Sequence, residues 1–194
     1  MSELKKKKNF DLRGILLFPI WLCMVGVAVY YLWSTRHFLV DDQRFNREIT
    51  KASAKYGLDS RLVKAVIFEE SHFKANEIGK AGEIGLMQIM PKLAAADWAR
   101  AHKKAVPSRG ELFSPELNLE IGCWFLRDGL ERFKDYDCAL ELALARYNAG
   151  LKRARKWAPE DKKAPVLDRI TISSTRKYVA NITKRYQRYC EESK

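Results

Sequence analysis

The residue best suited to do chemistry is Glu70, because an apolar helical pattern leads directly into it. Val63, Val66 and Ile67 lie seven, four and three residues before it, so all three would share its face on a helix. A carboxyl group held against apolar side chains loses hydration, which raises its pKa and keeps it protonated near neutral pH, as a general acid requires. The neighbouring Glu69 has a face nearly as apolar, and a solvated Glu at a helix end would fit the same pattern. Periodicity alone therefore leaves the choice between the two acids open.

A glycine-rich turn follows the two acids. Gly79, Gly82 and Gly85 recur every three residues, which favours a tight irregular turn where the backbone can approach a ligand. The turn lacks the Gly-Lys-Ser/Thr ending of a phosphate-binding loop, so we do not expect a nucleotide site. Residues 86–90 then form an apolar segment in which Gln88 is the one polar side chain.

The cysteines and histidines do not form a pattern of metal ligands. No Cys-X-X-Cys pair or Cys/His cluster of zinc spacing occurs, so we expect neither a metal nor another cofactor. In an oxidising compartment Cys123, Cys138 and Cys190 could form at most one internal disulfide bond, and buried apolar thiols at Cys123 and Cys138 are the preferred interpretation. The scattered residues are Cys23, Cys123, Cys138 and Cys190, and His37, His72 and His102.

The chain is strongly basic, with a formal net charge of +12 over 194 residues. Residues 152–194 hold thirteen Lys and Arg against five Asp and Glu, whereas the stretch around Glu70 is near balance. This excess indicates an anionic partner. The basic run at 152–156 could bind nucleic acid, but no nucleic-acid recognition fold accompanies it. An anionic polymer or lipid head groups are therefore the simpler expectation.

An apolar segment near the N-terminus predicts a transmembrane helix. Residues 14–33 carry no charge, and a helix of twenty residues spans about 30 Å, the thickness of a bilayer's hydrocarbon core. Lysines and an arginine precede the segment, which predicts that residues 1–13 stay in the cytoplasm and that the remainder is exported. Residues 34–42 would form a short linker. A signal peptide cleaved near 26–28, or a buried core helix, would also fit the apolar run.

The elements that would position Glu70 are predicted to be helices. One helix begins near Asp42 and ends at Gly57, and Asp59 or Ser60 then caps the helix that carries Glu70.

Three further helices are predicted after the glycine turn. Ser114 caps the first and Pro115 opens it, while Asp137 caps a second helix that ends at Gly150. The last helix covers about 174–189.

Four groups of residues occur in the order found in one known family. They are Glu70-Ser71 with Phe73 and Gly85-Leu86-Met87-Gln88; Ser114-Pro115 with Asn118, Gly122 and Leu126; Tyr147-Asn148-Ala149-Gly150; and Thr175-Arg176-Lys177-Tyr178-Val179. Together they resemble the catalytic domain of the soluble-lytic-transglycosylase-type enzymes, which are relatives of goose-type lysozyme. The resemblance covers roughly residues 43–190 and favours Glu70 over Glu69, because Glu70 directly precedes Ser71.

The resemblance implies a mainly α fold of the α+β lysozyme-like superfamily. A single helical domain over 43–190 would follow the transmembrane helix at 14–33, and 191–194 would be a tail. The implied activity is cleavage of the β-1,4 bond between MurNAc and GlcNAc of peptidoglycan, with formation of a 1,6-anhydro-MurNAc end. The protein would then be a single-pass protein of the inner membrane, with its catalytic domain on the periplasmic or extracytoplasmic side.

The resemblance also implies roles for individual residues. Glu70 would act first as general acid and then as base, and Tyr178 would form a hydrogen bond with it. The residues implied to bind glycan are Ser71, Gly85, Met87, Gln88, Tyr147, Asn148 and Tyr178. Neither a metal nor another cofactor is implied, and the expected partners are peptidoglycan strands and the membrane, not nucleic acid.

Two residues depart from the pattern of the family. The position that often holds a serine is Gly79, and the position after Gly82 that often holds alanine is Glu83. Glu83 is either a solvated or helix-start charge, which is the preferred interpretation, or a second carboxylate that contacts substrate or tunes Glu70.

Three alternative functions remain open at this stage. A hydrolytic muramidase could use the same fold, and a non-catalytic peptidoglycan-binding scaffold could serve an envelope complex. A membrane-tethered nucleic-acid binder would also account for the basic charge.

Overall fold

The computed structural model describes residue 21, residues 23–31 and residues 42–192, and it divides the chain into two units, 1–40 and 41–194. In the first unit, residues 21 and 23–31 are helical and their side chains are exposed. The remainder of the predicted transmembrane segment at 14–33, the N-terminal residues 1–13 and most of the linker lie outside the described residues. Within the residues that are described, no helix has both the length and the apolar character needed to cross a membrane.

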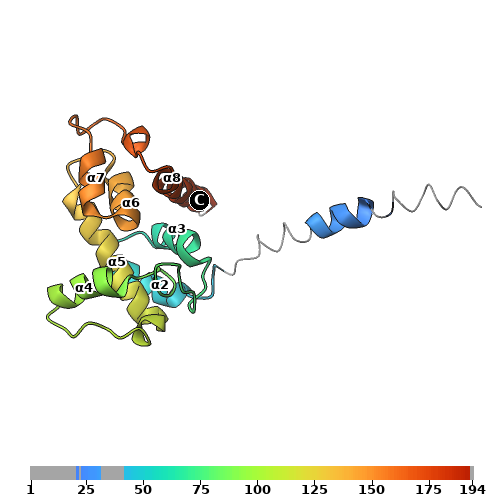
Figure 1. The fold of residues 1–194 in the computed structure, drawn as a ribbon, viewed down its shortest axis with the longest axis horizontal. Coiled ribbons are helices and arrows are strands. Elements are labelled where there is room, and N and C mark those ends of the chain that lie inside the picture. Colours follow the sequence, from blue (N-terminus) through green and yellow to red (C-terminus); the bar gives the residue numbers. More distant parts are fainter. Residues whose placement is uncertain (1–20, 22, 32–41, 193–194) are drawn as a thin grey trace, which may run out of the picture. The chain divides into compact units, whose positions relative to one another are not determined.

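The second unit is built from helices (Figure 1), as the sequence predicts. The helices are α2 (Asn46–Lys55), α3 (Ser60–Ser71), α4 (Ala96–Ala101), α5 (Pro115–Arg132), α6 (Ala139–Ala149), α7 (Leu151–Trp157) and α8 (Ser173–Glu192). A π-helical turn at Pro91–Ala95 and 3-10 turns at Glu111–Phe113 and Leu167–Arg169 complete the described elements. Among residues 42–192 the only β pairing is a pair of isolated bridges that join Ile84 to Ile78 and to Ile89.

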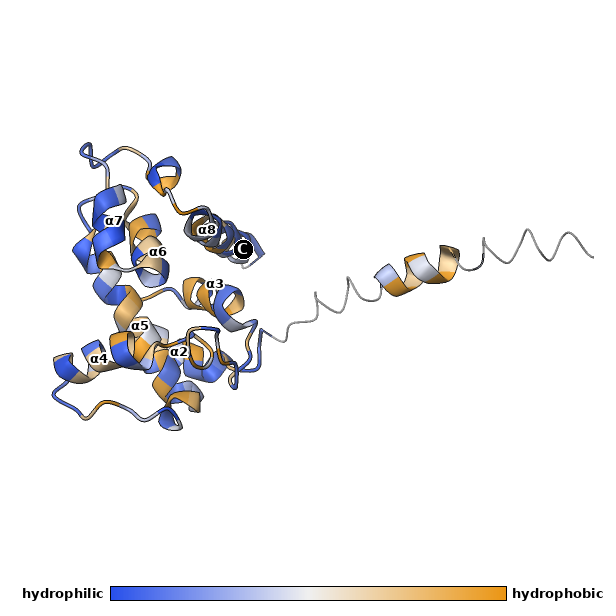
Figure 2. Cartoon of the chain, viewed as in Figure 1, coloured by the Kyte–Doolittle hydropathy of each residue, from blue (hydrophilic) through white to orange (hydrophobic). Residues whose placement is uncertain are grey.

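The long helix α5 lies between two groups of helices. In Figure 1 it runs between α2 and α4 on one side and α6, α7 and α8 on the other, and it packs directly against α2, α4 and α6. Helix α3 packs against α2 from the first group and α8 from the second. The helices are apolar on one side and hydrophilic on the other (Figure 2), and the apolar sides form the core. Because α3 contacts both groups, it is held in place from two sides.

Local sequence signals explain where α3 and α5 begin. The Asp59 side chain accepts a hydrogen bond from the backbone N–H of Arg61 at 2.8 Å, and Ser114 accepts one from Leu117 N–H at 3.4 Å. Pro115 occupies the first turn of α5, where its missing N–H leaves no bond unmade. The predicted caps of both helices are confirmed.

The predicted cap of α6 is wrong. Cys138, not Asp137, is the residue that precedes α6, and it makes no side-chain capping bond. The backbone N–H of Asp137 donates instead to the carbonyl of Lys162 at 2.9 Å, so this segment is fixed by the 159–166 loop. The helix ends before Gly150, whose φ of 87° favours glycine, as predicted. Helix α7, which contains the basic run, was not predicted.

Helix α5 packs closely against the segment after the glycine turn. A Cβ atom placed on Gly122 would lie 2.3 Å from the sulfur of Met87, whose side chain is fully buried. Glycine at this position thus allows the backbone of α5 to approach Met87.

We expect Gly122→Ala to lower the free energy of unfolding by about 1–3 kcal/mol, because the added methyl group overpacks this contact. Urea unfolding followed by circular dichroism would measure the loss. Gly110→Ala is the matched control, since a Cβ there meets nothing within 4 Å and its φ is −65°. Equal stability of the two variants would contradict the proposed tight contact.

Candidate active site

Glu70 lies in the last turn of α3 and is partly buried. The Tyr178 hydroxyl of α8 donates a hydrogen bond of 2.5 Å to its Oε1, as the sequence analysis predicted. The pKa of Glu70 is raised to about 7: burial is the main cause, the bond from Tyr178 acts in the opposite direction, and the charges of Glu69 and Glu83 add to the rise. At neutral pH this carboxyl group is therefore protonated in a large share of molecules, which suits a general acid.

The neighbouring Glu69 has a different environment. Its Oε1 accepts a hydrogen bond of 2.9 Å from the Asn181 amide on α8. Burial raises the pKa of the Tyr147 and Tyr178 phenols, and the charge of the nearby Glu70 adds to the rise in both. The geometry thus distinguishes the two acids where the helical period did not.

The chain reverses direction immediately after α3. His72 and Phe73 both have positive φ values, 51° and 61°, which are uncommon for residues with a Cβ atom. Ser71 is buried, and its hydroxyl donates to the carbonyl of Leu86 at 2.8 Å. This bond ties the end of the acid's helix to the segment that follows the glycine turn.

Asn118 of α5 holds the same segment from the other side. Its Oδ1 accepts from Met87 N–H at 2.8 Å, and its Nδ2 donates to the carbonyls of Ile84 and Leu112 at 2.7 and 2.8 Å. A Cβ on Gly85 would lie 2.4 Å from that Nδ2, and Gly85 has a φ of 80°. Both space and conformation therefore require glycine at 85.

Of the residues predicted to bind glycan, some form the frame of the site. The side chains of Ser71 and Met87 are buried, and Gly85 is enclosed by Asn118, so in this structure they shape the loop and do not present side chains to a ligand. Gln88 is partly exposed, with a φ of 46°, and its Nε2 donates to Gly85 O at 2.9 Å.

The third and fourth motifs lie on α6 and α8. The Tyr147 hydroxyl donates to the carbonyl of Met87 at 2.9 Å. Asn148 is exposed, and its Oδ1 accepts from the Thr175 hydroxyl of α8 at 2.7 Å. The structure therefore brings Glu70, Gln88, Tyr147 and the start of α8 together through direct hydrogen bonds and shared neighbours.

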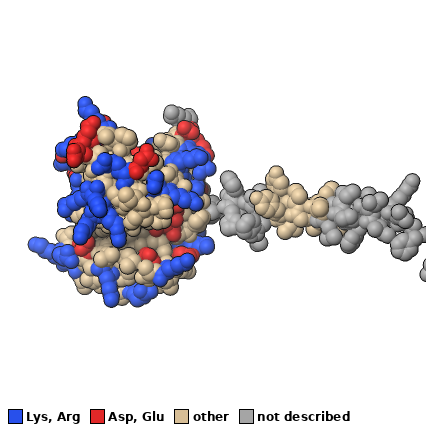
Figure 3. All heavy atoms as spheres, turned by 45° about the horizontal axis from the view of Figure 1, so that its top comes forward, with Lys and Arg blue, Asp and Glu red and all other residues tan. Residues whose placement is uncertain are grey.

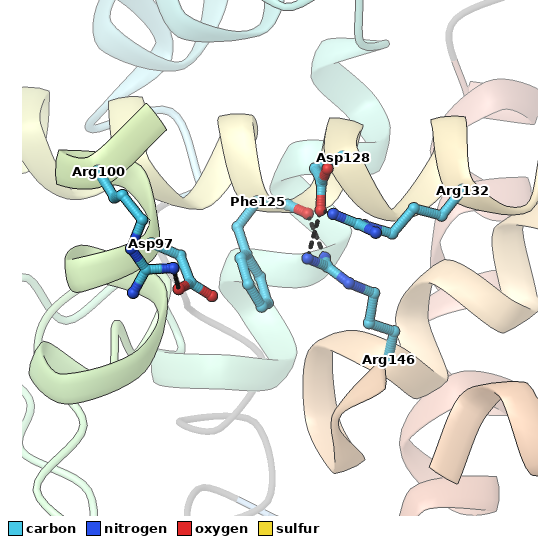
Figure 4. A network of polar contacts seen from close by, with 6 residues as sticks. All are labelled: Asp97, Arg100, Phe125, Asp128, Arg132 and Arg146. Carbon is cyan, nitrogen blue, oxygen red and sulfur yellow. Dashed lines mark hydrogen bonds and ion pairs between the residues drawn. The ribbon is translucent and has the colours of Figure 1, made fainter. Parts of the chain in front are cut away.

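An ion pair between the buried Arg146 and the partly buried Asp128 packs against Tyr147 through the Phe125 ring. The sequence analysis did not predict this ion pair. The Arg146 side chain is 6% exposed, forms an ion pair with Asp128 at 2.5 Å and donates to the carbonyl of Phe125 at 2.7 Å (Figure 4). Its guanidinium lies over the Phe125 ring at 3.9 Å, and that ring contacts Tyr147 edge-on. The signal was an arginine directly after the apolar residues 142–145 and directly before Tyr147.

Lys and Arg side chains predominate on the face of the domain shown in Figure 3, with carboxylates between them.

Cys123 and Cys138 are buried free thiols, in line with the preferred interpretation of the sequence. Among residues 21, 23–31 and 42–192, no group of His, Cys, Asp and Glu could hold a metal ion.

Comparisons with known proteins agree on one family. The family model described as the transglycosylase SLT domain matches residues 47–168. A membrane-bound lytic murein transglycosylase C from Glaesserella parasuis is 28% identical over 173 residues, which cover 79% of this chain and 48% of that relative. A membrane-bound lytic murein transglycosylase E from Buchnera aphidicola is also 28% identical, over 77% of this chain and 68% of its own length.

Solved structures of the same family share the fold. The lytic transglycosylase Slt of Pseudomonas aeruginosa, solved as an inactive mutant, superposes with a TM-score of 0.67 at 25% identity. The 70 kDa soluble lytic transglycosylase of Escherichia coli gives a TM-score of 0.64 at 27% identity, over 76% of this chain. This chain spans 24% of each of those longer chains and about half (48%) of the Glaesserella relative.

Glu70→Gln should stabilise the protein at pH 8 by about 1–3 kcal/mol and have little effect at pH 4. The pKa of Glu70 is raised from 4.5 to about 7 in the folded state, so the stability of the wild type falls as pH rises through that window, whereas Gln does not ionise. Urea unfolding at several pH values would measure the difference. Glu77→Gln, which removes a more exposed carboxylate, is the control, and a pH-independent difference for Glu70→Gln would contradict the proposed burial.

Arg146→Ala should destabilise the domain by about 2–4 kcal/mol, because it leaves the Phe125 carbonyl and the partly buried Asp128 short of a donor. Arg132→Ala is the matched control: Arg132 contacts the same Asp128 oxygen, but its side chain is 42% exposed, so a loss below about 1 kcal/mol is expected. Thermal unfolding of both variants would compare them. Similar losses would show that burial of Arg146 is not what makes the pair important.

Proposed function

Because this chain belongs to the transglycosylase SLT domain family, we propose that it is a peptidoglycan lytic transglycosylase. It would cleave the β-1,4 bond between MurNAc and GlcNAc and leave a 1,6-anhydro-MurNAc end. One observation carries the proposal: the carboxyl group of Glu70, partly buried and with a pKa raised to about 7, is held by Tyr178 beside the loop that bears Gln88.

In the first step, protonated Glu70 gives its proton to the glycosidic oxygen as the bond from that oxygen to C1 of MurNAc breaks. The GlcNAc hydroxyl leaves, and positive charge develops at C1. The Tyr178 hydroxyl donates to Oε1 of Glu70, which leaves Oε2 to carry the proton that is transferred. Tyr178 would therefore orient the acid.

In the second step, the Glu70 carboxylate takes the proton of the C6 hydroxyl of the same MurNAc. The freed oxygen forms a bond to C1 and closes the 1,6-anhydro ring. Water is neither consumed nor released, and Glu70 returns to its protonated state. One carboxyl group suffices for both steps, since it acts as acid and base in succession.

Gln88, Tyr147 and Asn148 are the proposed glycan contacts, since their side chains are at least partly exposed around Glu70. The Tyr147 hydroxyl already donates to Met87, which leaves its ring and its lone pairs for a sugar. Asn148 keeps its Nδ2 for a carbonyl acceptor such as an N-acetyl group, because its Oδ1 is occupied by Thr175.

A hydrolytic muramidase is the alternative within the same fold. A retaining hydrolase with an enzymic nucleophile needs a second carboxylate about 5 Å from the acid. The charge of Glu83 acts on Glu70, which makes Glu83 the candidate for such a role. The two activities differ in the released end, 1,6-anhydro for the lyase and reducing for the hydrolase.

We also propose that residues 14–33 anchor the enzyme in the inner membrane with its domain outside the cytoplasm. The uncharged run behind four lysines supports the anchor, and two similar proteins carry the description membrane-bound. The high positive charge would favour association with an acidic wall polymer.

Glu70→Gln should lower the release of muropeptides from purified peptidoglycan by at least about a hundredfold, because Gln cannot donate a proton. Mass spectrometry of the digest should find 1,6-anhydro ends with the wild-type protein. Glu69→Gln is the matched control on the same helix, and Gln there keeps an oxygen for Asn181, so release should persist. Equal release by the wild type and Glu70→Gln, or none by either, would exclude this function, and reducing ends would identify a hydrolase.

A further inference from the structure

The two departures from the family pattern, Gly79 and Glu83, meet in the structure. A Cβ atom placed on Gly79 would lie 2.3 Å from Oε2 of Glu83 and 2.6 Å from Oε1 of Gln88. Gly79 does not have the positive φ found at Gly82 and Gly85. The constraint at 79 is therefore one of space and not of backbone conformation, because a side chain there would displace the ends of Glu83 and Gln88.

The Glu83 carboxylate is fixed in this space by the turn itself. The backbone N–H of Ala81 donates to its Oε2 at 2.9 Å. The turn is closed by two backbone bonds, from Gly79 N–H to Glu83 O at 2.9 Å and from Gly82 N–H to Gly79 O at 3.0 Å. The turn therefore sets the direction of a carboxylate that stays partly exposed to solvent.

Gln88 presents a second oxygen to the same place. Its Nε2 donates to Gly85 O at 2.9 Å, which fixes the orientation of the amide and leaves Oε1 directed toward Gly79. No donor among residues 42–192 bonds to this Oε1, and Gln88 is partly exposed. Two acceptor oxygens, Oε2 of Glu83 and Oε1 of Gln88, therefore lie around Gly79 on partly exposed side chains, which favours a ligand that supplies O–H or N–H donors.

The negative charge of Glu83 also reaches the acid. Tyr178 from α8, Glu69 from α3 and Glu83 from the turn are the titratable groups that act on Glu70, and the charge of Glu70 in turn acts on Tyr147 from α6. Of these, the two carboxylates raise its pKa, because a like charge disfavours ionisation.

We propose that Gly79 and Glu83 form a functional pair, in which glycine admits the Glu83 carboxylate as a positioning residue of the active site. Glu83 holds a negative charge near Glu70 and, with Oε1 of Gln88, accepts hydrogen bonds from hydroxyl or N-acetyl N–H groups of the glycan. The inference rests on the proposed function, since it assigns a role within that same site.

The first test is the pH profile of kcat/KM for Glu83→Gln on soluble glycan fragments. Gln keeps the shape and the bond from Ala81 but removes the charge, so the alkaline limb, where Glu70 loses its proton, should move to lower pH. Activity above neutral pH should fall by about twofold or more relative to the maximum. Glu77→Gln is the matched control in the same loop, because its carboxylate pairs with Lys74, and its profile should overlay that of the wild type.

The second test is a double-mutant cycle between positions 79 and 83. Gly79→Ala should lower kcat/KM by about tenfold in the wild-type background, because the methyl group meets both the Glu83 carboxylate and Oε1 of Gln88, and by a clearly smaller factor in the Glu83→Ala background, where only the contact with Gln88 remains. The same cycle measured by thermal unfolding should show the same dependence without any need for activity. That readout separates failure of the pair from failure of the proposed function.

An unchanged profile for Glu83→Gln, or equal effects of Gly79→Ala in both backgrounds, would overturn the proposal. If wild type releases anhydro muropeptides while either of these results is found, the proposed function stands and the role of Glu83 falls. If the wild type is inactive, the proposal falls with the function, whereas the thermal cycle still decides whether the two residues depend on each other.

Discussion

The site depends on keeping one carboxyl group partly out of water while one of its oxygens stays free to react. Burial at the end of α3 raises the pKa of Glu70, and Tyr178 limits this rise with a hydrogen bond to Oε1. Neither effect alone would suffice, since an exposed carboxyl would be ionised at neutral pH and a fully buried one could not reach a substrate. Helix α3 can hold this balance because α2 packs on one side of it and α8 on the other.

That balance requires segments distant in sequence to meet around a loop with little regular structure. In a β-sheet the backbone groups of such a segment would pair with a neighbouring strand. Here the buried amide of Asn118 forms those hydrogen bonds instead, with the backbone of Ile84, Met87 and Leu112. Ser71 then ties the same loop to the acid's own helix. An unpaired backbone group costs about 1–3 kcal/mol when buried, so these bonds stabilise one conformation of the loop against others. Motif residues such as Ser71 and Asn118 therefore stabilise the loop, and few side chains of the motifs are left to contact a ligand.

Local signals predicted most of the fold, because they act within a few residues. The capping residues Asp59 and Ser114 and the terminal Gly150 were correct for this reason. The error at Asp137 arose from a tertiary contact, since its N–H is used by Lys162, 25 residues away. The role of Arg146 likewise depends on a partner on another helix, which periodicity within one helix does not identify.

The departures from the family pattern also show that residues considered one at a time do not reveal the contacts they make in the folded chain. Taken one at a time, a glycine where serine is common and a glutamate where alanine is common suggest a lost contact and a surface charge. In three dimensions they are one change, because the side chain absent at Gly79 leaves the space that the Glu83 carboxylate occupies. The contact between Gly79 and Glu83 therefore becomes visible only once the loop has folded around Asn118.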